Sequence, residues 1–101
     1  MYSVEFVFSK RGAMRFISHL DLMRLFTRAL RRAEIPVKMT EGFNPHPRFG
    51  IQRALKLGVE SDNETARAVM RVYISAPEFV SKLQKQLPKG IEIRDAKGNF
   101  N

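Results

Sequence analysis

The residue types best suited to chemistry in this chain are concentrated in one stretch, residues 15–47. Four arginines recur there at three- and four-residue spacing, which places them on one face if the segment is helical. They are Arg24, Arg28, Arg31 and Arg32. The planar guanidinium group matches the oxygens of phosphate, whereas lysine would solubilise a surface equally well. We therefore expect these four side chains to bind the phosphates of a nucleic acid.

Both histidines of the chain lie in the same stretch, at positions 19 and 46. His46 stands between two prolines in the segment GFNPHP, residues 42–47, where the prolines stiffen the backbone and remove two N–H donors. Arg48 follows directly and would add a fifth phosphate contact. The loop thus brings an aromatic ring, an amide and an imidazole into a small region. We expect a pocket wall formed by His19, Asp21, Phe43, Asn44 and His46.

A metal site or an acid–base site would be the alternative use of these histidines. Two distant histidines are a weak metal signal because a protein site needs three or four ligands, which Asp21 or Glu41 would have to complete. Histidine titrates near neutrality and can move protons, but no nucleophile of clear character stands beside either one. We expect no metal and no cofactor, with each imidazole bonded to backbone.

An amphipathic helix must position the arginines. Ser18 is a good N-cap, and Asp21 three residues later completes a capping-box arrangement. Pro36 should stop the helix and force its predecessor out of helical geometry. The apolar stripe recurs at helical spacing and consists of Leu22, Phe26, Ala29, Leu30 and Ala33. The arginines lie opposite this stripe.

Alternating apolar and polar residues predict strands on either side of this helix. The predicted strands cover residues 2–8, 37–57 with the loop as an interruption, 68–74 and 91–93, and residues 95–101 are expected to fray. A second helix is predicted after Ser75, with Pro77 near its start and Glu78 in a capping box. The order β-α-β-β-α-β predicts an α+β, ferredoxin-like fold: a four-stranded antiparallel sheet with both helices on one face. Its open face would present Tyr73 as a lone aromatic, too little for an RNA-recognition motif.

Composition favours a basic binding domain. The 101 residues predict one domain spanning residues 1–101. With 18 Lys+Arg against 10 Asp+Glu, the net charge is +8, which favours a polyanionic partner, nucleic acid first. The absence of cysteine excludes disulfides and iron–sulfur ligation within the chain. The chain has no apolar run of membrane-spanning length and no signal peptide. We therefore expect a cytoplasmic protein without a membrane partner.

The segments RFISHLDLMRLFTRALRRAEIPV, EGFNPHPR and LGVES resemble a family of uncharacterised proteins linked to radical SAM enzymes, the DUF2344-type domain. The match runs from about Lys10 to Ser61, and its SHLD, GFNPHP and LGVES blocks keep the family's order and spacing. Members occur beside, or fused to the C-terminal end of, a B12-binding-type radical SAM protein, so the resemblance implies such a partner. The segment FGIQRALKL departs from the sequence pattern of the family, and the family domain is commonly longer. The resemblance therefore implies a truncated or divergent version of this domain.

The charge and the resemblance together predict an accessory domain that recognises RNA or another anionic substrate for a radical SAM partner, without catalytic activity of its own. Two alternatives stay open. In one, the basic helix docks on an acidic surface of the partner enzyme and no nucleic acid takes part. In the other, the chain is a small enzyme that uses His19, Asp21 and His46.

Overall fold

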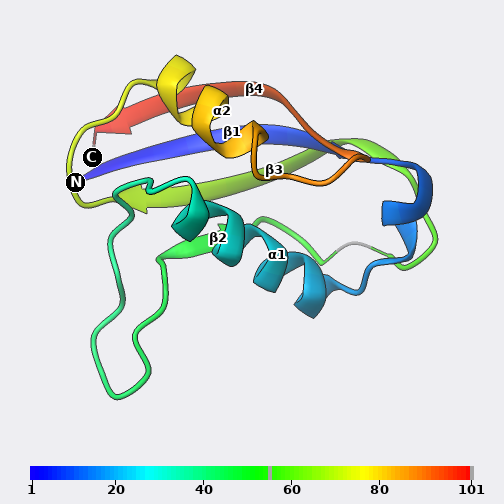
Figure 1. Cartoon of the computed structure of the whole chain (residues 1–101), viewed down its shortest axis with the longest axis horizontal. Helices are drawn as coiled ribbons and strands as arrows, with labels where there is room; N and C mark the ends of the chain where they lie inside the picture. The colour runs from blue at the N-terminus through cyan, green and yellow to red at the C-terminus, as the bar shows by residue number, and fades with distance from the viewer. Residues whose placement is uncertain (55, 101) are drawn as a thin grey trace.

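The structure is a computed structural model that describes residues 1–54 and 56–100. Its elements, in chain order, are β1 (Tyr2–Lys10), the 3-10 helix η1 (Gly12–Phe16), α1 (His19–Arg32), β2 (Phe49–Ile51), β3 (Ser61–Met70), α2 (Ala76–Gln84) and β4 (Ile91–Phe100). In this described part, the strands form one antiparallel sheet in the order β2-β3-β1-β4. Both α-helices lie on the same face of the sheet (Figure 1). The predicted ferredoxin-like fold is confirmed.

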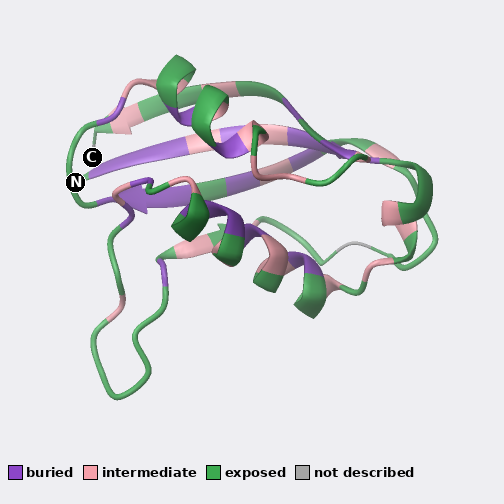
Figure 2. Ribbon diagram, in the orientation of Figure 1, coloured by how far each residue is buried: buried purple, intermediate pink, exposed green. Residues whose placement is uncertain are grey.

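Strand β1 is the centre of the sheet because β3 pairs with one of its edges and β4 with the other. Its alternation of apolar and polar residues sends Tyr2, Val4, Phe6 and Phe8 toward the helices, where all four are buried. Figure 2 shows the buried residues gathered between the sheet and the two helices. The core is therefore one layer, bounded by the inner face of the sheet.

Helix α1 begins at the predicted N-cap and buries the predicted face, but only half of the predicted capping box forms, because the Asp21 carboxylate pairs with Arg24 instead. The Ser18 hydroxyl accepts a hydrogen bond from the Asp21 amide at 3.1 Å, which caps the first turn. The Phe26 ring lies edge-on to the Phe8 ring at 4.9 Å between centroids and 5.3 Å from the Phe49 ring. The buried residues of the helix are Leu22, Phe26, Ala29 and Leu30. The helix ends at Arg32, before Pro36, because the chain turns at residue 34 with a positive φ of 55°.

Helix α2 also begins at its predicted N-cap, although the Glu78 carboxylate pairs with Lys82 instead of completing the predicted capping box. The Ser75 hydroxyl accepts a hydrogen bond from the Glu78 amide at 3.2 Å, and a proline occupies the first turn. Phe79 and Leu83 are buried, and Val80 lies partly buried beside them. None of the helices in residues 1–54 and 56–100 is long and apolar enough to cross a membrane.

The second predicted strand is largely wrong. Val37 and Met39 make only isolated bridges, to Met70 and Pro47, and regular pairing is confined to Phe49–Ile51. The prolines and the loop at residues 42–47 interrupt the backbone donors that a continuous ladder needs.

The third and fourth strands have other bounds than predicted. β3 begins at Ser61, where a turn was expected, and ends at Met70, so residues 71–74 leave the sheet. β4 continues to Phe100, although residues 95–101 were expected to fray; Asn101 lies outside the described residues. Both polar segments are held as strands by long antiparallel pairing with β1, which overrides their weak strand propensity.

Removal of the Phe26 ring tests this packing. We expect Phe26→Ala to lower the free energy of unfolding by roughly 3–5 kcal/mol, because the site is fully buried among other rings. Phe43→Ala is the matched control: Phe43 is fully exposed, and its loss should change stability by less than about 0.5 kcal/mol. Urea denaturation measures both. A loss below about 1 kcal/mol for Phe26→Ala would contradict the packing of α1.

Candidate nucleic-acid interface

The four arginines of α1 are all exposed on the helix surface that faces away from the sheet. Arg24 lies 3.6 Å from the Asp21 carboxylate, an exposed pair of little strength. Among the described residues, Arg28, Arg31 and Arg32 have no ion-pair partner. The face is thus a cationic surface without internal neutralisation along most of its length.

A groove beside this face adds a further cation. It runs between the C-terminal half of α1 and the C-terminal end of α2, and Arg28, Arg32 and Lys85 are its charged lining residues. The uncharged part of the lining consists of Leu25, Ala29, Gln86, Leu87 and Pro88. Three positive groups, two from α1 and one from the C-cap of α2, therefore line one groove, and no Asp or Glu among the described residues lines it, which suits an anionic oxygen.

The loop at residues 40–48 projects from the edge of the sheet, and backbone hydrogen bonds join its two sides. The Thr40 amide donates to the His46 carbonyl at 2.8 Å, and the Arg48 amide donates to the Lys38 carbonyl at 2.8 Å. His46 Nδ1 lies 3.2 Å from the Asn44 carbonyl oxygen and 3.3 Å from the Thr40 hydroxyl; in the tautomer with a hydrogen on Nδ1, it donates to that carbonyl. The expected backbone bond of this imidazole is confirmed.

The loop does not form the predicted pocket wall. Phe43, at its tip, is fully exposed, so its ring lines no cavity. Arg48 and His46 instead line a shallow hollow with Thr40 and Arg67, next to β2. This hollow shares no lining residue with the groove between the two helices. Arg48 is therefore separate from the arginine face of α1.

His19 lies far from this loop, and the predicted pocket that joins it to His46 is wrong. His19 begins α1 and follows η1, which leaves the sheet at the Lys10 end of β1. The loop is tied to the other end, where the Lys38 amide donates to the Val69 carbonyl at 2.8 Å. The 14-residue helix between the two sites spans about 21 Å. Figure 1 shows the loop beyond the opposite end of α1.

The polar groups near the helix start form no joint site with the loop. His19 Nδ1 is buried and has no hydrogen-bond partner among the described residues, contrary to the expected backbone bond. Asp21 is exposed; its backbone amide donates to the Ser18 hydroxyl, and its carboxylate pairs with Arg24. Nowhere in residues 1–54 and 56–100 do three or more His, Cys, Asp or Glu side chains come close enough to hold a metal ion.

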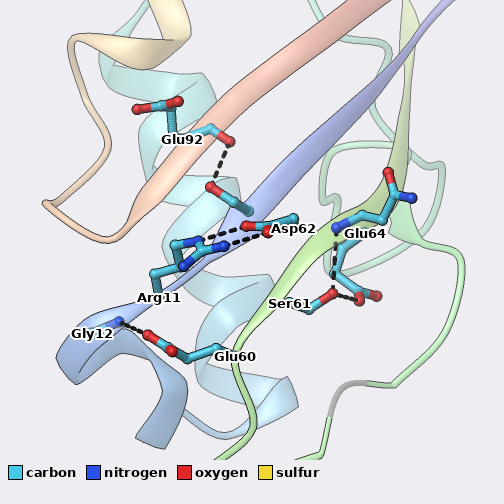
Figure 3. A network of polar contacts seen from close by, with 9 residues as sticks. Arg11, Gly12, Glu60, Ser61, Asp62, Glu64 and Glu92 are labelled. Atoms are coloured by element: carbon cyan, nitrogen blue, oxygen red, sulfur yellow. Dashed lines mark hydrogen bonds and ion pairs between the residues drawn. The ribbon is translucent and has the colours of Figure 1, made fainter.

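The LGVES segment joins the start of the domain to β3. The Gly58 amide donates to the Arg15 carbonyl at 2.6 Å, and the positive φ of 83° at Gly58 favours glycine there. The Gly12 amide donates to the Glu60 carboxylate at 2.7 Å, and Arg11 forms an ion pair with Asp62 (Figure 3). These contacts hold η1, and so the start of α1, against the segment that leads into β3.

Two buried charges near this junction were not predicted. Lys10 and Glu64 are each 1% exposed, and the Lys10 ammonium donates to the carbonyls of Ile17 and Lys56 at 3.4 and 3.5 Å. Burial lowers the pKa of Lys10, and the negative charge of Glu64 opposes that shift.

Glu64 is held in its charged form by its neighbours. Arg53 donates to both carboxylate oxygens, at 3.1 and 2.9 Å, and the Ser61 hydroxyl donates to one of them. The hydrogen bond from Arg53 keeps the pKa of Glu64 below its ordinary value, although burial acts in the opposite direction. The sequence prediction missed them because the predicted strands, residues 2–8 and 68–74, contain neither residue; in the structure both occupy inward positions of β1 and β3, where apolar residues are expected.

The open face of the sheet is polar. Ser3 is fully buried there, and its hydroxyl accepts a hydrogen bond from Arg67 Nε at 3.1 Å. Tyr73 lies beyond the end of β3 rather than on this face, because β3 stops at Met70. The strand residues of this face therefore offer no aromatic platform of the RNA-recognition-motif kind in the part that the structure describes.

The fold and the surface define a small ferredoxin-like α+β domain with an exposed cationic helix. A family described as an uncharacterised protein conserved in bacteria (DUF2344) matches residues 4–99, and the chain belongs to this family. No curated protein and no solved structure matches the chain.

The charged cluster at Glu64 predicts a pH dependence of stability. Because the folded-state pKa of Glu64 is depressed, its contribution is present above the unfolded pKa, near 4.3, and is lost as the pH falls through the lower folded pKa. Glu64→Gln should remove this part of the acid transition and cost about 1–3 kcal/mol at pH 7, since Lys10 loses its countercharge. Denaturant unfolding from pH 7 to pH 2 measures both effects.

The control for the lost charge is Glu92→Gln, at an exposed position of β4. It should change the free energy of unfolding at pH 7 by less than about 0.5 kcal/mol. Equal, small losses in the two variants would show that Glu64 is not held as a buried, charged group.

Proposed function

We propose that this domain binds structured RNA through the arginine face of α1, defined as Arg24, Arg28, Arg31 and Arg32. The observation that carries the proposal is the lack of ion-pair partners for three of these arginines among the described residues. Like charges four residues apart on a helix are destabilising. An anionic ligand would remove this repulsion and supply bidentate partners for the guanidinium groups.

The dimensions of the face suit a nucleic-acid backbone. Arg24 and Arg32 are eight residues apart, which is about 12 Å along the helix. In a double helix each strand carries one phosphate per about 3.4 Å of axis, so the face spans roughly three to four phosphates. Lys85, across the groove, would add a contact on one side. The net charge of +8 would increase the rate of encounter with any polyanion.

Structured RNA is the favoured polyanion because α1 offers charge without base-reading amides. The helix contains neither Asn nor Gln, the side chains that pair with adenine in the major groove of DNA. Double-stranded RNA is recognised mainly through its shape and its backbone. The resemblance to radical SAM-linked proteins adds a partner enzyme to the proposal, to which this non-catalytic domain would present the RNA.

The salt dependence of RNA binding tests the proposal. Each phosphate contact releases counterions, so four engaged arginines should give a slope of log affinity against log salt near −3. Arg28→Gln combined with Arg31→Gln should reduce the slope magnitude by about 1.5, because two contacts are lost. Titration of a labelled RNA hairpin across a salt series measures the slopes.

Arg94→Gln combined with Lys97→Gln is the matched control, since both residues are exposed on β4 and the net charge falls equally. This control should keep the wild-type slope. Identical slopes for the α1 variant and the wild type would exclude these arginines as phosphate contacts. An absence of RNA binding at low salt would overturn the proposal in favour of docking on an acidic surface of a partner protein.

A further inference from the structure

Three aromatic side chains from separate parts of the sequence form a cluster at one end of the sheet. The Tyr2 ring lies 5.0 Å from the Tyr73 ring and 4.6 Å from the Phe100 ring, measured between centroids. The Tyr73 and Phe100 rings are parallel to within 1°, with centroids 6.3 Å apart. Tyr73 is 65% exposed and Phe100 74% exposed, so most of the surface of both rings faces solvent.

Tyr2 supports the two exposed rings of this cluster. It is buried, and its hydroxyl donates a hydrogen bond to the Ile74 carbonyl at 2.8 Å. Its phenol ring lies across Gly98 of β4, where even a methyl group would overlap it. The two exposed rings therefore rest on a side chain that is held at both its ring and its hydroxyl. A ligand that stacks on them would not have to order the site first.

The hollow around these rings is aromatic and cationic at once. It has a volume of about 850 Å³, and its charged lining residues are Lys38 and Arg71. The other lining residues are Met1, Tyr2, Met39, Met70, Val72, Tyr73 and Phe100. Among the described residues, no Asp or Glu lines this hollow, so its charged side chains favour a ligand with negative charge.

We propose that this hollow, the ring site, binds an unpaired nucleobase of the RNA, with Tyr73 and Phe100 as its stacking surface and Lys38 and Arg71 near the phosphates. Every base has a π-face, and proteins that bind single strands combine aromatic rings with positive groups in this way. The inference rests on the proposed function and extends it: the substrate class is an RNA with unpaired nucleotides next to a structured part.

The position of the ring site would allow one RNA molecule to contact both this site and the arginine face of α1. The Arg71 amide donates to the Pro36 carbonyl at 2.7 Å, and Val37 bridges to Met70. The chain thus links the ring site directly to the end of α1 that carries Arg32. Figure 1 shows this end of α1 and the end of β3 on the same side of the domain.

A protein partner suits the ring site less well. Lysine is depleted in the desolvated centres of protein interfaces, whereas Lys38 lines this hollow together with Arg71. An apolar partner surface would leave both cations without a counterion. A nucleotide matches both parts of the lining. Its base can stack on the rings, and its phosphate can pair with the cations.

The test compares two RNA probes that carry equal charge. One is a hairpin with a short single-stranded extension, and the other carries an abasic extension with the same number of phosphates. The wild type should bind the first at least about 5-fold more tightly, since stacking on one ring is worth about this factor or more. Tyr73→Ala and Phe100→Ala should each reduce this ratio toward one. Tyr73→Phe, which keeps the ring, should preserve it. Phe43→Ala, which removes an exposed ring outside this hollow, should preserve it as well.

The outcomes separate the two proposals. Equal, salt-sensitive affinity for both probes, reduced by the α1 variant, would overturn the ring site and leave RNA binding by α1 standing. An absence of binding to both probes would overturn both. A ratio that survives the loss of either ring would place the base elsewhere. Sedimentation of the free protein completes the test: dimers that dissociate in Tyr73→Ala would show a contact between copies instead of a base site.

Discussion

The packing of Phe26 against the rings of β1 and β2 is the contact on which the rest of this domain depends. It fixes the rotation of α1 about its own axis, because Phe26 is fully buried between the Phe8 and Phe49 rings. With 3.6 residues per turn, that rotation leaves the arginine face toward solvent. A different rotation would bury a guanidinium group without a partner, at a high desolvation cost. The core and the cationic surface are therefore consequences of one helix register.

Local signals predicted the helices and the first strand, and non-local pairing decided the rest. The caps at Ser18 and Ser75 and the apolar stripe of α1 involve residues within a few positions of each other, so the sequence alone predicts them. The extents of β3 and β4 depend on the length of β1, to which both pair. No local property of residues 61–63 or 95–100 indicates a strand, which is why their polar sequences suggested turns and a frayed end.

The candidate site, too, was predictable from the sequence only where it depends on local signals. The arginine face follows from helical periodicity and was predictable, whereas the joint pocket of His19 and His46 required knowledge of which end of the sheet each segment meets. The aromatic cluster could not be predicted, because Tyr2, Tyr73 and Phe100 meet only through the pairing of β1 with β3 and β4. The buried charges at Lys10 and Glu64 lie outside the predicted strands at residues 2–8 and 68–74, and only the longer pairing of β1 with β3 places them in the sheet.

The central claim, that RNA lies along α1, is tested most directly by backbone amide NMR during titration with an RNA hairpin. The account predicts that chemical-shift changes concentrate on residues 24–32 and on Lys85 across the groove, and that the open face of the sheet stays unchanged. Ser3, Glu5 and Arg67 report on that face. Shifts confined to these three and their neighbours, with α1 unchanged, would contradict the account.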